Sequence, residues 1–471
     1  MSNPVLQSHI AGRWIGATPA QTLKSAVNGR PVAATHSETL DFAEAVDHAR
    51  RVGGPNLLKL DFQQRAARLR ALAKYLTERK EQLYAWSAHT GATRNDGWID
   101  IEGGSGTLFA YAGVANDLPS GNLLHEGPVL PLSKKGGFAG THILVPRGGV
   151  AVHINAFNFP VWGLLEKLAP TFLAGMPCIA KPATATSYLT EALVRLIAES
   201  GLLPEGALQL VIGGTGDLLD HLQGNDVVTF TGSADTAARL RVHPNLVCQS
   251  VPFNAEADSL NCAILAPDVG PDDEEFDLFV KEVAREMTVK AGQKCTAIRR
   301  AIVPRRHLDA VATKLRERLA KVSVGDPALE AVRMGALASH AQAADVAERV
   351  AQLRAVASLV TDATGFAPQG EGVAEGAFFA PTLLLCDKPF DSDAVHDVEA
   401  FGPVSTLLPY DDSSGIDEAL ALAARGRGSL VGTLVTRTPA IAARAIPQAA
   451  AWHGRLLVLD REAAVESTGH G

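Results

Sequence analysis

Hydrophobic residues recur with two different periods along the chain, and these periods predict where helices and strands lie. Leu69, Leu72 and Leu76 are three and four residues apart, a spacing that places them on one helix face. A second helical pattern begins at Leu108. From about residue 123 to residue 145, glycine, proline and short apolar runs predict a hairpin instead.

Short apolar runs in the middle of the chain alternate with stretches of helical pattern. The runs have the length of buried strands and span residues 150–154, 177–181, 208–212 and 227–230. This alternation predicts a parallel, Rossmann-like sheet. Polar and glycine-rich residues directly follow each run. Since ligands of open α/β sheets bind at the carboxyl ends of the strands, we expect a binding site at that edge.

A second alternation begins near Glu256 and predicts another α/β unit. Its segments are a strand at 260–265, a helix at 274–293, a strand at 296–303, a helix at 307–322, a loop at 361–376 and a last strand at 429–436. The expected fold class is therefore α/β with two main domains.

Composition and charge narrow the classes of function. The 471 residues include 20% charged positions and carry a net charge of -8, and the 43 lysines and arginines form no basic run. This argues against nucleic-acid and membrane partners. No apolar run is long enough for a membrane helix, and the first residues lack a basic segment followed by an apolar one. We therefore expect a cytoplasmic protein.

The five cysteines, at positions 178, 248, 262, 295 and 386, show neither a paired framework nor metal-ligand spacing. They are predicted to be reduced thiols, with no metal site. Four of them lie in or beside apolar runs and are expected to be buried. Cys295 differs, because it lies among small residues in AGQKCTA, between a helix and a strand. A reactive thiolate needs a lowered pKa or a nearby base, and Lys294 is the only cation in that run.

A run of glycines at residues 213–216 (GGTG) follows a predicted strand. Leu219 stands where the third glycine of a dinucleotide fingerprint would fall, so an ordinary turn is the alternative interpretation.

Five segments together resemble the aldehyde dehydrogenase superfamily in order and interval. They are NAFNFPVWGLLEKLAPTFLAGMPCIAKPA from Asn155, FTGSADTA from Phe230, AEADSL from Ala255, GQKCTA from Gly292 and EAFGPV from Glu399. The resemblance implies a cofactor-binding domain at 1–254 with an oligomerisation hairpin at about 123–145. It also implies a catalytic domain at 255–430 and a return to the cofactor and oligomerisation region at 431–471. The sequence stops before the glycine-rich segment and final strand that the family usually has.

The same resemblance assigns four catalytic residues. Cys295 is the implied nucleophile, and Glu256 is the implied general base that activates water to release the acid. Asn158 matches the side chain that, with the Cys295 backbone N–H, stabilises the developing oxyanion. Lys167 lies in the region where the family keeps a proton-relay lysine. Asp258, where the family normally has glycine, is expected to raise the pKa of Glu256 by repulsion.

Cofactor contacts are also carried over from the family. They are Asn155, Lys181, Thr184, Gly213, Gly216, Thr231, Gly232 and Ser233 at the edge of the first sheet, and Glu399 and Phe401 in the nicotinamide-ribose segment. Thr184 stands where NAD-preferring members often carry glutamate. A carboxylate binds a ribose 2′-OH but repels a 2′-phosphate, so threonine favours NADP, with NAD as the alternative.

The narrower resemblance is to the dehydrogenase part of bifunctional phenylacetate-degradation enzymes, carried by INAFNFP, KPATAT, EADSLN and AGQKCTAIRR. It implies oxidation of 3-oxo-5,6-dehydrosuberyl-CoA semialdehyde in a homo-oligomeric enzyme. The alternative is 3,4-dehydroadipyl-CoA semialdehyde from aerobic benzoate degradation. Two further alternatives are a non-catalytic relative of the fold and a thioester hydrolase that uses Cys295 without cofactor.

Overall fold

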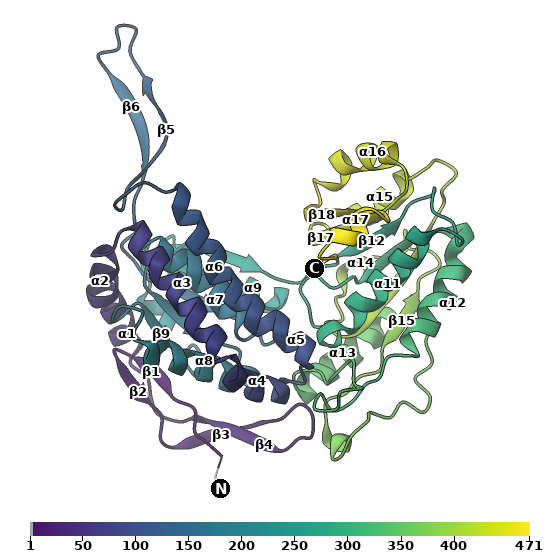
Figure 1. Ribbon diagram of the computed structural model, residues 1–471, viewed down its shortest axis with the longest axis horizontal. Helices are drawn as coiled ribbons and strands as arrows, with labels where there is room; N and C mark the ends of the chain where they lie inside the picture. The colour runs from purple at the N-terminus through teal and green to yellow at the C-terminus, as the bar shows by residue number, and fades with distance from the viewer. Residues whose placement is uncertain (1–2) are drawn as a thin grey trace. The chain divides into compact units, whose positions relative to one another are not determined.

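The computed structural model describes residues 3–471, which form two compact units. Unit 1 comprises the residues up to 24 together with 30–89 and 97–257, and unit 2 comprises 25–29, 90–96 and 258–471. Each unit contains one large sheet with helices on both faces (Figure 1). The predicted α/β class is confirmed.

The large sheet of unit 1 is mostly parallel. Its order is β11 (Phe253–Glu256), β10 (Val227–Thr231), β7 (Ala151–Ile154), β8 (Cys178–Lys181), β9 (Leu208–Leu210), β1 (Ser8–Ile10) and β2 (Arg13–Ile15). The four strands predicted in this region are confirmed, with ends that differ by one or two residues.

Alternation along β7 shows why the sheet is covered on both faces. Val152 and Ile154 pack into one apolar cluster, together with residues of α1, α9 and α10. Ala151 packs into the other cluster, together with residues of α3, α6, α7 and α8. Parallel sheets are stable when both faces are buried in this way. These helices are α1 (Phe42–His48), α3 (Phe62–Glu78), α6 (Gly104–Val114), α7 (Trp162–Leu173), α8 (Ser187–Ser200), α9 (Ala234–Arg241) and α10 (Pro244–Cys248).

Helix α3 illustrates how local sequence sets an element. Asp61 caps its N-terminus by accepting from the Gln64 backbone, while the Gln64 side chain accepts from the Asp61 backbone. The predicted face of Leu69, Leu72 and Leu76 is fully buried. Shorter helices of the N-terminal part are α2 (Gly54–Leu58), α4 (Lys80–Ser87) and α5 (Arg94–Trp98).

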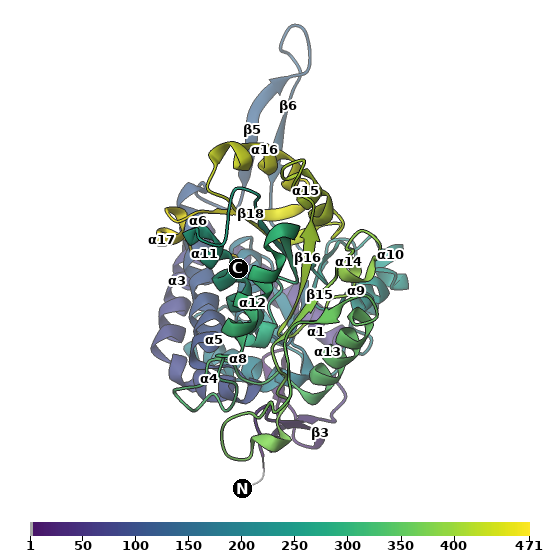
Figure 2. The same cartoon turned by 90° about the vertical axis from the view of Figure 1, so that its right-hand side faces the viewer.

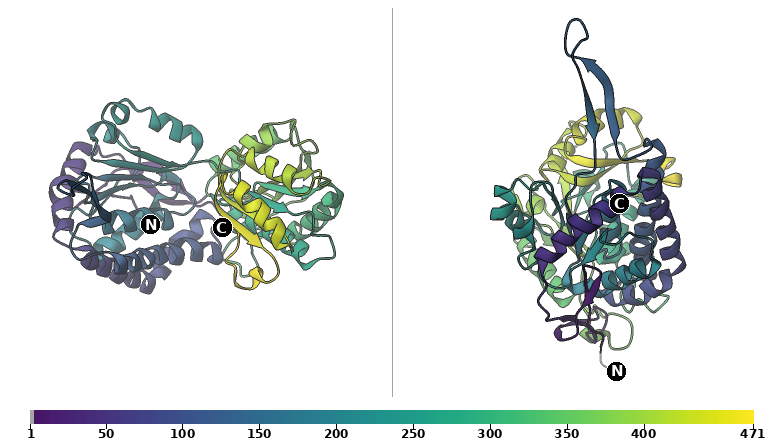
Figure 3. Two further views of the ribbon diagram at one scale, coloured as in Figure 1. Left: turned by 90° about the horizontal axis from the view of Figure 1, so that it is seen from above. Right: turned by 90° about the vertical axis from the view of Figure 1, so that its left-hand side faces the viewer.

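Two small antiparallel sheets complete unit 1. One pairs β3 (Pro19–Lys24) with β4 (Pro31–His36). The other pairs β5 (Leu124–Pro131) with β6 (Ala139–Leu144), which confirms the predicted hairpin. The hairpin extends from unit 1 as a long two-stranded arm (Figures 1 and 3). Its apolar side chains are exposed and include Val129, Leu130, Phe138 and Ile143.

The large sheet of unit 2 is parallel except at one edge. Its order is β14 (Ser358–Leu359), β15 (Thr382–Leu385), β16 (Val404–Tyr410), β13 (Arg300–Pro304), β12 (Cys262–Leu265), β17 (Ser429–Val435) and β18 (His453–Leu459). Residues 431–471, for which the family resemblance implies a return to the cofactor region, belong to unit 2. The reason is that residues 432–435 of β17 pair with β12, and β18 pairs with β17 in turn.

Helices cover both faces of this sheet as well. α11 (Glu274–Thr288) and α12 (Leu308–Leu319) lie side by side on one face (Figure 2), while α13 (His340–Leu353), α15 (Asp417–Ala424) and α16 (Pro439–Ala449) pack on the other. The short helices are α14 (Ala394–Asp397) and α17 (Ala463–Glu466). The helix predicted at 274–293 ends early, at Thr288, because the backbone turns left-handed at Lys290 and Ala291.

Candidate active site

The carboxyl ends of the parallel strands in unit 1 bring several predicted residues to one edge. Ile154 on β7 is paired with Lys181 on β8 and with Phe230 on β10. Thr231 at the end of β10 is paired with Glu256 at the end of β11. Neighbouring strands are about 4.8 Å apart. Asn155, Lys181, Thr231 and Glu256 therefore lie along a single sheet edge. The sequence pattern predicts this edge for Asn155, Lys181 and Thr231 but places Glu256 in the second unit, whereas β11 pairs with β10 and brings Glu256 into unit 1.

Polar side chains at this edge are buried without partners inside the protein. Asn155 is 4% exposed, and neither polar atom of its side-chain amide has a hydrogen-bond partner among the described residues. The Thr231 hydroxyl also lacks one within the described chain. An unpaired buried polar group costs about 1–3 kcal/mol. Such groups at the ligand-binding edge of an α/β sheet favour a polar ligand that pairs with them.

The structure explains in different ways why glycine occurs at positions along this edge. A side chain at Gly232 would place its Cβ 2.6 Å from the Phe230 ring, so only glycine fits beside that ring. Gly213 and Gly216 have φ values of 104° and 46°. A Cβ at Gly216 would also meet the Phe42 ring at 2.5 Å, so packing against α1 explains this glycine without a ligand.

Helix α9 begins beside this edge, at Ser233. The Ser233 hydroxyl accepts from the Thr236 backbone at 3.4 Å and caps the helix. Thr184 begins a short turn after β8, and burial lowers the pKa of Lys181. Residues 181–186, from the end of β8 through this turn, contain no acidic side chain.

The two remaining predicted residues of unit 1 lie around α7. Asn158 is buried in the segment that leads into the helix. Lys167 donates to the Glu166 carboxylate at 2.9 Å, and the Trp162 indole N–H donates to the other Glu166 oxygen at 3.0 Å. Glu166 therefore fixes the Lys167 ammonium on the surface of α7.

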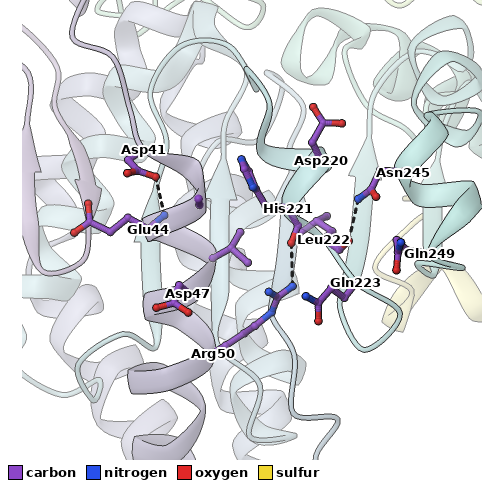
Figure 4. A pocket seen from close by; sticks show the side chains of 12 residues that line it. Asp41, Glu44, Asp47, Arg50, Asp220, His221, Leu222, Gln223, Asn245 and Gln249 are labelled. Carbon is purple, nitrogen blue, oxygen red and sulfur yellow. Dashed lines mark hydrogen bonds between the residues drawn. The ribbon is translucent and has the colours of Figure 1, made fainter.

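The helices and turns that cover one face of the same sheet hold an open pocket of about 790 Å³, lined by residues of α1, of α10 and of the turn at Leu218–His221 (Figure 4). Its polar groups are engaged with the protein itself. Asp41 caps α1, Arg50 binds Asp226 and the His221 carbonyl, and Asn245 donates to the Leu219 and Leu222 carbonyls. These bonds join α10 and the segment after α1 to the turn at Leu218–His221 and to Asp226, which gives the pocket a structural explanation.

In unit 2, Cys295 follows an unusual backbone turn. Lys290, Ala291 and Gly292 all have positive φ, at 54°, 52° and 68°. Asp96 stabilises the turn by accepting from the Lys290 backbone at 2.7 Å, and the Lys290 ammonium binds Thr90. A Cβ at Gly292 would lie 2.1 Å from the Gly402 carbonyl oxygen, so glycine is required where the two backbones meet.

A buried asparagine holds the backbone of Cys295 itself. The Asn261 amide donates to the Cys295 carbonyl at 2.8 Å and to the Ala297 carbonyl at 3.1 Å. The Asn261 side-chain oxygen accepts from the Ser259 hydroxyl and from the Val431 backbone. Cys295 is partly exposed while Asn261 is fully buried, so the thiol is presented on a rigid support.

Glu399 belongs to the same hydrogen-bond network as Asn261, because Ser259 bonds to both residues. Its carboxylate accepts from the Arg299 side chain at 3.1 Å and from the Ser259 backbone at 3.1 Å. Burial raises the pKa of Glu399 to about 7, against the opposing attraction of Arg299, and the Asp258 carboxylate adds to the rise. Phe401 follows, with the Arg299 guanidinium over its ring at 5.3 Å.

Sequence reasoning missed Asn261, Ser259 and Arg299 as parts of the site. They occur in EADSLN and AGQKCTAIRR, two of the segments that carry the narrower family resemblance. The available signal was polar residues beside apolar runs that read as core strands. Asn261 directly precedes one such run, and the pair Arg299 and Arg300 precedes another. Buried polar groups at such places need hydrogen-bond partners within the protein.

The cysteine predictions hold for three of the four expected buried thiols. Cys178, Cys262 and Cys386 are buried, whereas Cys248 is exposed at the end of α10. That prediction was wrong because α10 is short and buries only Leu246. Cys262 has an unforeseen partner, since its sulfur lies 3.4 Å from the His453 ring nitrogen.

No group of His, Cys, Asp or Glu suited to a metal ion occurs in residues 3–471. Within the same residues no helix combines the length and apolar character of a membrane span.

Comparison with known sequences gives a family for most of the chain. Residues 17–455 match the model of the aldehyde dehydrogenase family. The 3,4-dehydroadipyl-CoA semialdehyde dehydrogenase of Aromatoleum evansii is 46% identical over 469 residues, which cover 99% of this chain and 90% of that protein. Protein MaoC of Klebsiella aerogenes is 46% identical over 138 residues, which cover 29% of this chain and 39% of that protein.

Solved structures show the same fold. Betaine aldehyde dehydrogenase from Staphylococcus aureus, in complex with NAD+, matches with a TM-score of 0.82 and 21% identity over 96% of this chain and 86% of that one. An NAD-dependent aldehyde dehydrogenase from Sinorhizobium meliloti matches with a TM-score of 0.82 and 23% identity over 97% of this chain and 87% of that one.

Proposed function

The chain belongs to the aldehyde dehydrogenase family, and on this premise we propose that it oxidises a coenzyme A-linked semialdehyde to the corresponding acid with NADP. The observation that carries the proposal is the 46% identity over 99% of the chain to a dehydrogenase of such a semialdehyde. The five ordered motifs and the support built around Cys295 agree with it.

Cys295 is the proposed nucleophile. Its thiolate adds to the aldehyde carbon and leaves an alkoxide, which the Asn158 amide and the Cys295 backbone N–H stabilise. Loss of hydride from that carbon gives a thioester. Glu256 then takes a proton from water, the resulting hydroxide attacks the thioester carbonyl, and the acid leaves as the thiolate is restored. We propose Lys167 for proton relay, as the family resemblance implies.

The residues present fit a nicotinamide dinucleotide. When bound, this group supplies the hydride acceptor. Asn155 and Thr231 offer unpaired polar atoms, and Gly232 leaves room beside the strand end for a close approach. Ser233 and the first N–H groups of α9 suit a pyrophosphate. The remaining proposed contacts are Lys181, Thr184, Gly213, Gly216, Glu399 and Phe401.

NADP is the proposed form because Thr184 and Lys181 lie at the end of β8. A lysine attracts a 2′-phosphate, and threonine in place of an acid removes the repulsion. NAD remains the alternative.

The substrate proposed first is 3,4-dehydroadipyl-CoA semialdehyde, the substrate in the name of the Aromatoleum evansii relative. The motif resemblance favours 3-oxo-5,6-dehydrosuberyl-CoA semialdehyde, but the 46% identity over 99% of the chain favours the alternative. Both are thioesters of coenzyme A with a terminal aldehyde, so the same chemistry serves either.

Kinetics with matched substrates test the proposal. The purified protein is assayed with the two CoA semialdehydes and with a free semialdehyde, each with NADP and with NAD. We expect kcat/KM to be highest for 3,4-dehydroadipyl-CoA semialdehyde with NADP. A higher value for the free semialdehyde contradicts the substrate class, and a higher value with NAD contradicts the cofactor assignment.

We also propose that the enzyme is a cytoplasmic homo-oligomer. Reduced cysteines suit the cytoplasm, and the exposed apolar residues of the β5–β6 hairpin suit burial against another copy. Changing Val129 and Leu130 together to Ser is expected to shift the species seen by sedimentation towards monomer. An unchanged distribution excludes the hairpin as the interface.

A further inference from the structure

Arg299 connects two separate segments of unit 2. The residue is 4% exposed, and all three nitrogens of its guanidinium group donate hydrogen bonds within unit 2. One guanidinium nitrogen donates to the Gly402 carbonyl at 2.8 Å, and the Nε donates to the Glu399 carboxylate. The other terminal nitrogen donates to the Gly292 carbonyl at 2.9 Å and to the Lys294 carbonyl at 3.4 Å. Arg299 therefore bonds both the turn before Cys295 and the Glu399 segment.

We propose that Arg299 is a positioning residue for the nucleophile, an inference that rests on the proposed function. The Lys294 carbonyl belongs to the same peptide group as the Cys295 N–H, the proposed oxyanion donor. Since a peptide group is planar, holding its oxygen also sets the direction of its N–H. Asn261 holds the following carbonyl, so the backbone of Cys295 is fixed on both sides.

The local backbone explains why such a clamp is needed. Lys290 and Ala291 adopt left-handed φ values that non-glycine residues rarely keep unless neighbouring contacts hold them. Asp96 holds the beginning of this turn, and Arg299 holds its end. Loss of Arg299 would let the segment relax towards ordinary φ values and turn the Cys295 N–H away.

Arginine suits this position better than lysine. Its planar fork offers five donors in fixed directions, whereas a lysine ammonium is a compact charge on a flexible stem. The buried Glu399 carboxylate also needs a cation, because an unpaired buried charge is costly. Lys at position 299 could satisfy the carboxylate but not all three carbonyls.

The neighbouring residue provides a matched control. Arg300 is also fully buried, and it donates to the Leu260, Leu422 and Ala423 carbonyls rather than to the turn before Cys295. Replacing either arginine by Met removes a buried cation and leaves carbonyls unpaired. Only the Arg299 change acts on the turn that leads to Cys295.

The test compares Arg299→Met, Arg299→Lys and Arg300→Met in the full chain. For Arg299→Met we expect kcat to fall by about 100-fold with KM for the aldehyde within about threefold, the pattern for a donor that acts in the transition state. Arg299→Lys should recover part of kcat. Arg300→Met should lower the melting temperature while kcat stays within about threefold of the wild type.

Hydrogen exchange supplies a readout that does not need turnover. In Arg299→Met the amides of residues 290–298 should exchange faster by about tenfold or more, and in Arg300→Met they should not. If Arg299→Met matches Arg300→Met in both kcat and exchange, the inference is overturned. If the wild type oxidises no aldehyde, the proposed function fails, and the exchange data still decide whether Arg299 holds the turn.

Discussion

The two units use opposite edges of their parallel sheets, and they treat polar groups there in opposite ways. In unit 1 the predicted residues follow the carboxyl ends of the strands, where Asn155 and Thr231 have no partner in the described chain. In unit 2 Asn261, Arg299 and Glu399 precede strands, and each is hydrogen-bonded within the protein. The edge proposed to bind the cofactor keeps polar atoms available, whereas the edge near the proposed nucleophile uses them to hold the backbone.

The largest expected effect concerns the nucleophile held by unit 2. Cys295→Ala is expected to lower kcat/KM for aldehyde oxidation by about 10⁴-fold or more, because no other group supplies the covalent step. Steady-state NADPH formation measures this. Cys248→Ala, at the exposed end of α10, is the control and should stay within about twofold of the wild type. Equal loss in the two variants would refute the assignment.

Two asparagine variants test directly whether the polar side chains of the two edges differ in their hydrogen bonding. Asn261→Leu should destabilise the protein by about 2–4 kcal/mol, since it leaves the Cys295 and Ala297 carbonyls unpaired. Asn155→Leu should leave the stability of the ligand-free protein unchanged or higher, because no hydrogen bond within the chain is lost. Denaturant unfolding measures both. A similar loss at the two sites would show that the Asn155 amide is paired.

The affinity for nucleotide gives a second test of the Asn155 amide. Asn155→Leu should weaken the affinity for NADP by about fivefold to tenfold, the loss of one hydrogen bond to a ligand. Calorimetric titration measures the affinity. Unchanged affinity would remove Asn155 from the proposed contacts.

The pH dependence of stability should also differ between the units. His153 on β7 is buried between Thr229 and Thr171, and burial lowers its pKa to about 3. The unfolded chain takes up this proton near pH 6.5 while the folded chain does not. Unit 1 should therefore lose about 1.4 kcal/mol per pH unit as the pH falls below 6.5. His153→Gln should flatten this loss in thermal melts between pH 4 and 7, and an unchanged slope would contradict it.

The smallest effect has the opposite sign and comes from unit 2. The pKa of Glu399 is raised to about 7, so the folded chain holds a proton that the unfolded chain releases near pH 4.5. Stability from this group is greatest below pH 4.5 and decreases as the pH rises towards 7. Glu399→Gln should remove that decrease. A variant that still loses stability over this range would assign the effect to another group.

Sequence reasoning succeeded where the signal is local. The strands β7, β8, β9 and β10 and the hairpin were predicted from apolar runs and turn residues, because burial and turn geometry leave clear patterns. The early end of α11 was missed, since the left-handed residues Lys290 and Ala291 are ordinary helix formers. The Asp96 carboxylate stabilises that turn, and the Gly402 backbone leaves no room for a side chain at Gly292. Both residues are distant in sequence from the turn.

The sequence by itself determined the family, the α/β class and which residues are candidates for chemistry, because motifs and hydrophobic periods are properties of neighbouring residues. Only the tertiary structure decided what holds Cys295. The Arg299 guanidinium and the Asn261 amide are buried, and each donates to carbonyl groups of segments that are distant in sequence. A hydrogen bond between residues far apart in sequence forms only after the strands have paired, so no local pattern records it.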